Sequence, residues 1–297
     1  MVSRQLFAML GQSRTFAQVL DEARLVSATD LNVLLAGESG TDKGLLAQFI
    51  HENSPRRQGK MLSQNCTGVA PSRLNTDLFE CGLFERAHRG TLLLLDVDEM
   101  GARTQQRMLR FLENDETPDV RIISATTRDL LERPSERAFC VDLYYRLNVA
   151  HLRIPALREC RDDISFLVRN FLKLLSEHFR LPLCELGPSA MAALEAYGWP
   201  GNISELRAVA QQLALSHAGR VVAADELPEA VLAQTGPVPP TDPKRSFTFL
   251  QRPRALRAAI DDAGRVTPAG QRKAVRVRRT TGPSIPSSRP ASARARA

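Results

Sequence analysis

The chain has 297 residues, of which 43% are hydrophobic and 25% are charged. These proportions are typical of a soluble globular protein, and the length allows one α/β domain with a smaller companion. No apolar run reaches the ~18 residues of a membrane-spanning helix, and the N-terminus has too few apolar residues for a signal peptide. The five cysteines show no metal-like spacing. We therefore expect a cytoplasmic protein with reduced thiols, no metal centre and no membrane contact.

The net charge of +7 is unevenly distributed along the chain. Residues 251–297 contain 12 Lys or Arg and 2 Asp or Glu, whereas the first 250 residues contain 28 basic and 31 acidic ones. A basic segment of this kind favours contact with nucleic acid. A solvated, disordered end has the same composition, so composition alone does not separate the two interpretations.

The first half of the chain alternates between strand and helix patterns. Short apolar runs at residues 32–35, 91–95 and 120–125 predict buried strands, and apolar spacing predicts helices over 44–52 and 103–113. Strands that alternate with helices in this way predict a parallel sheet with helices on both faces.

The pattern changes to helices alone after Pro155. Amphipathic stretches at residues 162–179, 189–197 and 204–215 predict a helical subdomain without a competing strand pattern. The proline-rich sequence QTGPVPPTDP then predicts a linker outside any packed core. A further short helix over 254–263 would lie within the basic tail.

A glycine-rich segment between the first strand and the following helix has the position of a phosphate-binding loop. It reads Gly37-Glu38-Ser39-Gly40-Thr41-Asp42-Lys43-Gly44. Backbone amides of such a loop face an anion, and Lys43 is placed to reach the β and γ phosphates. Asp42 replaces the second glycine of G-x-x-x-x-G-K-[ST], and Gly44 replaces the hydroxyl that would hold Mg²⁺. The Asp42 carboxylate would lie near the negatively charged triphosphate. Two like unit charges at ~4 Å repel by roughly 1 kcal/mol in water and ~4 kcal/mol near a protein surface. We expect ATP binding to be weak or lost, with Mg²⁺ present only if ATP binds.

Six sequence blocks occur in order between about residues 10 and 232. They read GESGTDKGLLAQFIHENSPRR, NCTGV, HRGTLLLLDVDEM, SATTRDL, FCVDLYYRLNVAHLRIPALRECRDDI and YGWPGNISEL. Together these blocks resemble the sigma-54-dependent AAA+ transcription activators, the bacterial enhancer-binding proteins. The resemblance implies an α/β AAA+ P-loop NTPase fold followed by a small α-helical lid. Because the similarity begins by about residue 10, we expect no receiver or ligand-sensing domain before it.

The resemblance also suggests how the chain is divided. We expect an AAA+ nucleotide-binding subdomain, a helical lid, a proline-rich linker and a basic, disordered tail, with bounds 1–157, 158–233, 234–250 and 251–297. Within the tail, AIDDAGRVTPAGQRKAVRVRRTT faintly resembles the family's Fis-like helix-turn-helix. Pro268 interrupts the helix needed in its middle. The tail is therefore interpreted as a remnant of such a domain that contacts DNA through its charge.

Three residues match functional positions of the family. Lys43 matches the phosphate-loop lysine, and Asn65 matches the asparagine that couples the catalytic glutamate to the sigma-factor loop. Arg146 matches one of two arginine fingers that reach a neighbouring subunit's nucleotide. The resemblance thus implies that Asn65 and Arg146 retain catalytic roles.

Other functional positions depart from the family. Aligned without gaps, the metal-binding Asp and the catalytic Glu fall on Leu95 and Asp96, and a one-residue slip gives Asp96 and Val97. One acidic group is lost in either alignment, with Asp96 left as the catalytic candidate. The family's sensor asparagine, second arginine finger and lid sensor arginine are replaced by Thr127, Cys140 and Ser204. Arginine fingers alone contribute about 10³–10⁵ in rate in related hydrolases, so we expect hydrolysis near background.

A loop that the family uses on its sigma factor is missing. In the family, LFG-[HY]-E leads into a segment with the sequence GAFTGA. Here Leu78-Phe79-Glu80-Cys81 runs directly into Gly82-Leu83-Phe84-Glu85. We therefore expect that the chain cannot remodel sigma-54 by the family's mechanism.

These observations predict a transcription regulator with weakened ATP binding and without hydrolysis or sigma-54 remodelling. The expected partners are DNA, RNA polymerase or a sigma factor, and further subunits in a homo- or hetero-oligomeric ring of the hexamer type. Two alternatives stay open. The first is an ATPase that works in a mixed hexamer with an intact paralogue, and the second is an inactive pseudogene product.

Overall fold

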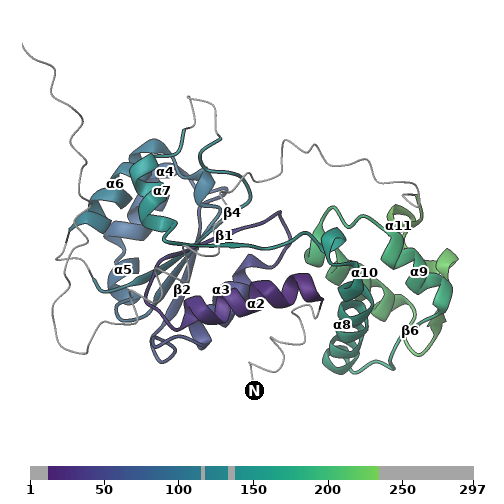
Figure 1. The fold of residues 1–297 in the computed structure, drawn as a ribbon. Helices are drawn as coiled ribbons and strands as arrows, with labels where there is room; N and C mark the ends of the chain where they lie inside the picture. Colours follow the sequence, from purple (N-terminus) through teal and green to yellow (C-terminus); the bar gives the residue numbers. More distant parts are fainter. Residues whose placement is uncertain (1–12, 115–117, 133–137, 234–297) are drawn as a thin grey trace, which may run out of the picture.

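The computed structural model describes residues 13–114, 118–132 and 138–233. Five parallel strands form one sheet in the order β2-β3-β4-β1-β5 (Figure 1). The strands are β1 (Val33–Ala36), β2 (Met61–Asn65), β3 (Thr91–Leu95), β4 (Arg121–Thr126) and β5 (Ala150–Arg153). The sequence predicted the three central strands, which are almost wholly buried. It did not predict β2 and β5, which lie at the two edges of the sheet.

Helices cover both faces of the sheet, which confirms the predicted fold class. Successive side chains of a strand point to opposite faces, so Val33 and Leu35 pack in one apolar cluster and Leu34 in another. The first cluster includes α2 (Arg14–Ser27) and α3 (Lys43–Glu52). The second includes the remaining helices of this part, which are α4 (Pro71–Asn75), α5 (Leu83–Arg86), α6 (Ala102–Glu113) and α7 (Val141–Leu147).

The shortened connection between α4 and α5 is packed. A π-helical turn, η1 (Thr76–Glu80), continues directly from α4, and Gly82 then adopts a positive φ of 66° before α5. The Phe79 ring centroid lies 5.7 Å from that of Phe84 and 5.8 Å from that of Phe111. Arg107 lies over the Phe79 ring at 4.6 Å. The connection between α4 and α5 is therefore stabilised by contacts between aromatic rings.

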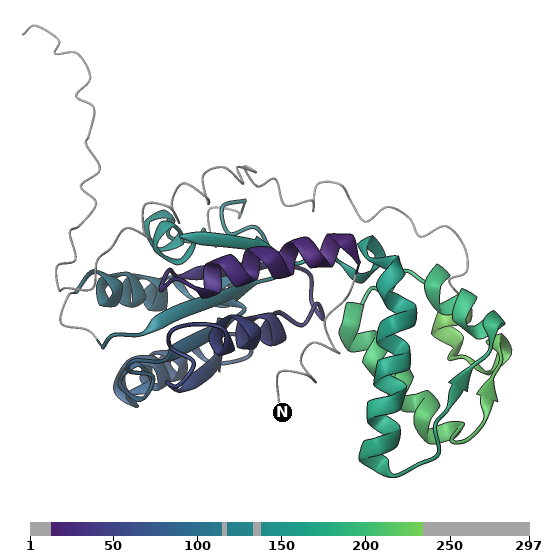
Figure 2. The same ribbon diagram turned by 60° about the horizontal axis from the view of Figure 1, so that its bottom comes forward.

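The lid is helical, as the sequence predicted, with one addition. Its helices are α8 (Ile164–Phe179), α9 (Pro188–Ala196), α10 (Asn202–Ser216) and α11 (Glu229–Ala233). The addition is a parallel pair of two-residue strands, β6 (Glu185–Leu186) and β7 (Val221–Val222). Trp199 is fully buried in the lid core, where its Nε1 donates to the carbonyl of Leu194 at 2.8 Å. In both views the lid, coloured green, stands to one side of the part that contains the sheet (Figures 1 and 2).

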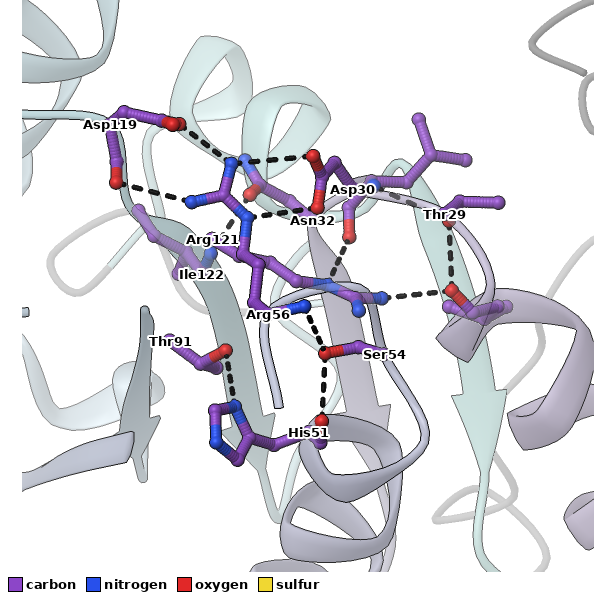
Figure 3. A network of polar contacts seen from close by, with 12 residues as sticks. Thr29, Asp30, Asn32, His51, Ser54, Arg56, Thr91, Asp119, Arg121 and Ile122 are labelled. Carbon is purple, nitrogen blue, oxygen red and sulfur yellow. Dashed lines mark hydrogen bonds and ion pairs between the residues drawn. The ribbon is translucent and has the colours of Figure 1, made fainter. Parts of the chain in front are cut away.

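Arginine contacts hold the amino-terminal edge of the sheet together (Figure 3). Arg121, at the start of β4, is 1% exposed, and its Nη2 donates to the carbonyl of Val26 in the last turn of α2 at 2.9 Å. Burial lowers the pKa of this arginine to about 10. Arg56 forms ion pairs with Asp30 and Asp119 at 2.8 and 2.6 Å. These contacts hold the amino-terminal ends of the strands in place. The predicted site lies in the loops at the carboxyl ends of the strands.

Two short helical turns, η4 (Leu157–Glu159) and η5 (Arg161–Asp163), lead from β5 into the lid. Within the described residues, no helix is both long and apolar enough to cross a membrane.

Candidate nucleotide-binding site

The predicted phosphate loop lies between β1 and α3, at the carboxyl edge of the sheet. The amide of Gly37 donates to the carbonyl of Thr126 at the end of β4 at 3.2 Å. The Thr41 hydroxyl donates to the carbonyl of Glu38 at 2.8 Å and closes the loop on itself. Parallel strands bind ligands in the crevice outside their carboxyl ends, so the loop lies where an anionic ligand is expected.

Lys43 is folded back onto its own loop. Its side chain is 8% exposed, and Nζ donates to the carbonyls of Gly37 at 2.9 Å and Glu38 at 2.8 Å. Burial lowers the pKa of Lys43, and the nearby carboxylates of Asp96 and Asp98 oppose this effect. The ammonium group therefore lies inside the loop with negative charges close to it.

Asp42 adopts a left-handed conformation that usually favours glycine. Its φ and ψ are 57° and 42°, and its side chain makes no capping hydrogen bond to α3. Instead, Oδ2 of Asp42 accepts a hydrogen bond from Nη2 of Arg207 on α10 at 2.7 Å. Burial raises the pKa of Asp42, while Arg207 and then Lys43 act to lower it. The residue that breaks the glycine pattern is thus paired with a cation from the lid.

A second ion pair joins the loop to the segment that leads into the lid. Arg158 Nη1 donates to Glu38 Oε2 at 2.8 Å, and this contact is the main reason that the pKa of Glu38 lies below its usual value. Asn202, at the start of α10, donates to the carbonyl of Ser39 at 2.9 Å. Its amide oxygen accepts from the amide of Leu157 at 2.9 Å. Hydrogen bonds from the lid and from the segment before it therefore hold the phosphate loop in place.

Ser204 reaches the loop through its backbone. Its amide donates to the carbonyl of Gly40 at 3.1 Å, next to a close approach between Gly40 and Gly201. A serine side chain is much shorter than that of an arginine and carries no charge. Ser204 thus lies at the loop but supplies no positive charge there.

The predicted acidic region lies at the ends of β2 and β3. Asp96 has a positive φ of 52°, and its Oδ2 accepts from the Thr67 hydroxyl at 3.2 Å. Asn65 Oδ1 accepts from the amide of Thr67 at 2.8 Å. The side chains of Asn65 and Asp96 are therefore both hydrogen-bonded to Thr67. The half-buried Leu95 packs against the apolar cluster on the α3 side of the sheet.

Three other predicted residues lie near the ends of β4 and on α7. Thr127 is half-buried and directly follows β4. Cys140 directly precedes α7, and its amide donates to Oε1 of Gln105 at 2.7 Å. Arg146, 45% exposed, pairs with Glu113 at the end of α6 at 3.2 Å. In the described part of the chain, Arg146 makes no hydrogen bond or ion pair with the phosphate loop.

Sequence reasoning missed Arg207 and Asp98. Arg207 follows Ser204 by three positions, so the two share a helix face, and this spacing could have identified Arg207. Asp98 is 1% exposed and accepts from the Thr126 hydroxyl at 3.1 Å. Its sequence context, two residues after Asp96, gave no signal of burial beside the end of β4.

The residues present supply few ligands for Mg²⁺. An added Cβ at Gly44 would meet no atom within 4 Å, so the place of the missing hydroxyl is open space. In the alignment without gaps, Leu95 offers only an apolar side chain where the family has its metal-binding carboxylate. Hard divalent cations prefer oxygen ligands. These two positions therefore supply no ligand for Mg²⁺, and the carboxylates that remain near Lys43 are those of Asp96 and Asp98.

A phosphate loop before α3, a β2-β3-β4-β1-β5 parallel sheet and a helical lid define a P-loop NTPase module of the AAA+ class. Comparison with known families agrees. The family model described as "Sigma-54 interaction domain" matches residues 9–153, and the model described as "AAA+ ATPase lid domain" matches residues 158–243. The chain belongs to the sigma-54 interaction domain family and is related to sigma-54-dependent transcriptional regulators.

Individual relatives support this assignment. The regulatory protein AtoC of Escherichia coli K12 is 36% identical in an alignment over 246 residues that covers 75% of this chain and 53% of AtoC. The transcriptional regulatory protein ZraR of the same strain is 31% identical in an alignment over 293 residues that covers 91% of this chain and 66% of ZraR. The crystal structure of NtrX from Brucella abortus in complex with ATP has a TM-score of 0.72 at 31% identity, with 88% of this chain and 64% of that chain covered. The chain thus spans about half to two thirds of the length of these relatives.

Proposed function

We propose that this chain is a transcription-regulating module that binds nucleotide weakly and does not hydrolyse it. Lys43 and the amides of the phosphate loop would bind the phosphates. The remnants of the catalytic group would be Asn65, Asp96 and Arg146. The site would also be lined by Thr127 and Ser204, which lack the polar contacts of the family's sensor asparagine and sensor arginine. Binding in relatives supports the first part, because NtrX has been crystallised with ATP and with ADP.

The observation that carries the loss of hydrolysis is the pair Leu95–Asp96 at the end of β3. Leu95 packs in an apolar cluster, and Asp96 is turned into a left-handed conformation and bound by Thr67. Activation of water requires a carboxylate within hydrogen-bond reach of the proton that it removes. Aspartate is one methylene shorter than the family's glutamate. We therefore expect neither a metal-binding acid nor an efficient general base here.

We also propose the chain's division and partners. The subdomains would span 1–157 and 158–233, followed by a linker at 234–250 and a basic tail at 251–297. The separate apolar clusters of the sheet-bearing part and the lid support this division. The regulator would act in the cytoplasm and contact DNA through the tail, which lies outside the described residues. RNA polymerase or a sigma factor and other AAA+ subunits would be its protein partners.

Steady-state phosphate release by the purified protein tests the proposal. We expect turnover at the level of a Lys43→Ala control, both at low protein concentration and at concentrations that favour ring assembly. Turnover comparable to that of an intact family member in the same assay would overturn the loss of hydrolysis. A parallel titration with ATP separates binding from turnover.

A second candidate function is an ATPase in a mixed ring with an intact paralogue. Arg146 favours it, because its half-exposed guanidinium bonds to the end of α6 and is accessible to a neighbour. The test adds this chain to an intact family member whose own arginine fingers have been removed. A gain in turnover that disappears with Arg146→Ala would support the mixed ring, and no gain would reject it.

A further inference from the structure

Arg207 brings a second positive charge to the phosphate loop. It lies on α10 one helical turn after Ser204, on the same face of the helix. Its Nη2 donates to Oδ2 of Asp42 at 2.7 Å, and Asp42 directly precedes Lys43. The guanidinium is therefore placed beside the residue from which the loop enters α3.

The lid core orients this arginine. The guanidinium lies over the Phe171 ring of α8 at 5.3 Å, and the buried Nε has no hydrogen-bond partner among the described residues. The side chain of Arg207 is 40% exposed, whereas that of Asp42 is 17% exposed. A guanidinium carries five N–H donors, of which the contact with Asp42 uses few. Arg207 thus holds its position and retains capacity for a further acceptor.

Asp42 stands at the N-terminus of α3, where backbone amides and the helix dipole favour an anion. Its carboxylate makes no hydrogen bond with these amides and is bonded to Arg207 instead. The planar fork of arginine binds carboxylates and phosphates equally well in geometric terms. The ion pair therefore resembles the contact that a phosphate group and a lid arginine would make.

We infer that Arg207 is a phosphate-binding residue of this chain and that Asp42 is its partner when no nucleotide is bound. The inference rests on the proposed weak nucleotide binding. The phosphates compete with Asp42 for the guanidinium, so binding is coupled to the contact between lid and loop. Nucleotides with more phosphate charge compete better, which gives an affinity order of ATP, then ADP, then AMP.

A double-mutant cycle tests this coupling by calorimetric titration with ATP. The proteins are the full chain and its Asp42→Gly, Arg207→Met and doubly substituted variants. Asp42→Gly should tighten binding, because it removes a like charge and the carboxylate that competes for Arg207. Arg207→Met should weaken binding about tenfold in the Asp42→Gly background, as expected for a charge-assisted hydrogen bond. The loss should be largest for ATP and smallest for AMP.

Controls separate a ligand role from a structural one. If Arg207 only neutralises Asp42, Arg207→Met will leave affinity unchanged once Asp42 is glycine, and the inference is overturned. Arg220→Gln removes a lid arginine that pairs with Glu226 at 3.0 Å, away from the loop, and should not change ATP affinity. Arg207→Lys keeps the charge without the fork and serves if the methionine variant does not fold. It should lose affinity by a smaller factor, and an unchanged affinity would count against the inference.

The same titrations distinguish this inference from the proposed function. If neither the wild-type chain nor Asp42→Gly binds ATP, the proposed nucleotide binding fails and the inference with it. Binding that is indifferent to Arg207 overturns the inference alone. ATP turnover by the wild-type chain would contradict the proposed loss of hydrolysis and leave the role of Arg207 to be decided by the cycle.

Discussion

At the phosphate loop, the backbones of two glycines come into contact. Gly40 has a positive φ of 77°, and a Cβ built on it would overlap the carbonyl oxygen of Gly201 at the entrance to α10. The amide of Ser204 donates to the carbonyl of Gly40 in the same place. Only a residue without a side chain permits this approach, so Gly40 links the conformation of the loop to the position of the lid.

We predict that Gly40→Ala lowers the free energy of unfolding by about 2 kcal/mol or more. Left-handed backbone costs a residue with a Cβ roughly 1–2 kcal/mol, and the overlap with Gly201 adds to it. Denaturant melts provide the measurement. Gly68→Ala tests the backbone conformation alone, because Gly68 has a φ of 73° and open space around it. Gly44→Ala has neither problem and should be neutral or stabilise by about 0.4–1 kcal/mol. Equal effects of Gly40→Ala and Gly68→Ala would show that the contact with Gly201 contributes nothing.

Residues of the site differ in how far the sequence could predict them. Lys43 was predictable because its role depends on a local motif between a strand and a helix. The pairing of Asp42 with Arg207 was not, because it joins residues 165 positions apart and depends on how the lid docks. The sequence identified Asp42 as a departure with an unfavourable charge. It gave no sign of the cation that compensates this charge.

Among the elements, the strands show why edge positions are hard to predict. The central strands β1, β3 and β4 are buried on both faces. In the sequence, β1 and β3 are nearly continuous apolar runs, and β4, with the sequence RIISAT, has an apolar centre. The edge strands β2, with the sequence MLSQN, and β5, with AHLR, are half-exposed and carry polar residues. Such short mixed segments lack a decisive periodicity. Their place in the sheet is fixed by pairing with β3 and β1.

The edge strand β5 contains a histidine whose burial should be visible as acid sensitivity. Desolvation lowers the pKa of His151 to about 4, and Asp129 only partly opposes this effect. In the unfolded chain an imidazole titrates near pH 6.5. Between these values the unfolded state binds a proton that the folded state does not, so stability is lost as the pH falls from about 6.5 to about 4.

We predict that His151→Gln removes this part of the pH dependence. The free energy of unfolding of the wild-type chain should fall by roughly 2 kcal/mol more than that of the variant across this window. Urea melts at pH 7, 5.5 and 4.5 provide the comparison. His178→Gln, at an exposed position of α8, is the matched control and should follow the wild type. Parallel curves for the wild type and His151→Gln would contradict the assignment.

For the molecule as a whole, we expect the packed connection between α4 and α5 to limit its action on a sigma factor. The rings of Phe79, Phe84 and Phe111 contact one another in this connection. The resemblance to the family places the GAFTGA loop, which acts on the sigma factor, at the same point of the chain. We predict that open-complex formation at a sigma-54 promoter will not depend on this protein and ATP. An intact member of the family at its own promoter is the positive control. A clear ATP-dependent signal from this chain would mean that another surface replaces the missing loop.

The basic tail, outside the described residues, raises the question of how the molecule contacts DNA. Residues 251–297 hold an excess of ten positive charges, which should attract DNA phosphates whether or not the tail folds. Contact with phosphates alone gives similar affinity for all duplexes. Its log affinity falls with log salt at a slope of about −0.9 per phosphate contact. A folded helix-turn-helix would add base contacts worth ~1–3 kcal/mol each and would discriminate among sequences.

We predict the first behaviour, because Pro268 interrupts the helix that a helix-turn-helix needs in its middle. Competition titrations with random and palindromic duplexes at two salt concentrations measure both the slope and the preference. Truncation after Thr241 should abolish binding, because the first 250 residues carry an excess of acidic groups. A strong preference for one sequence that persists at the higher salt concentration would contradict the prediction. Such a preference requires contacts with base edges, which salt screens much less than it screens contacts with phosphates.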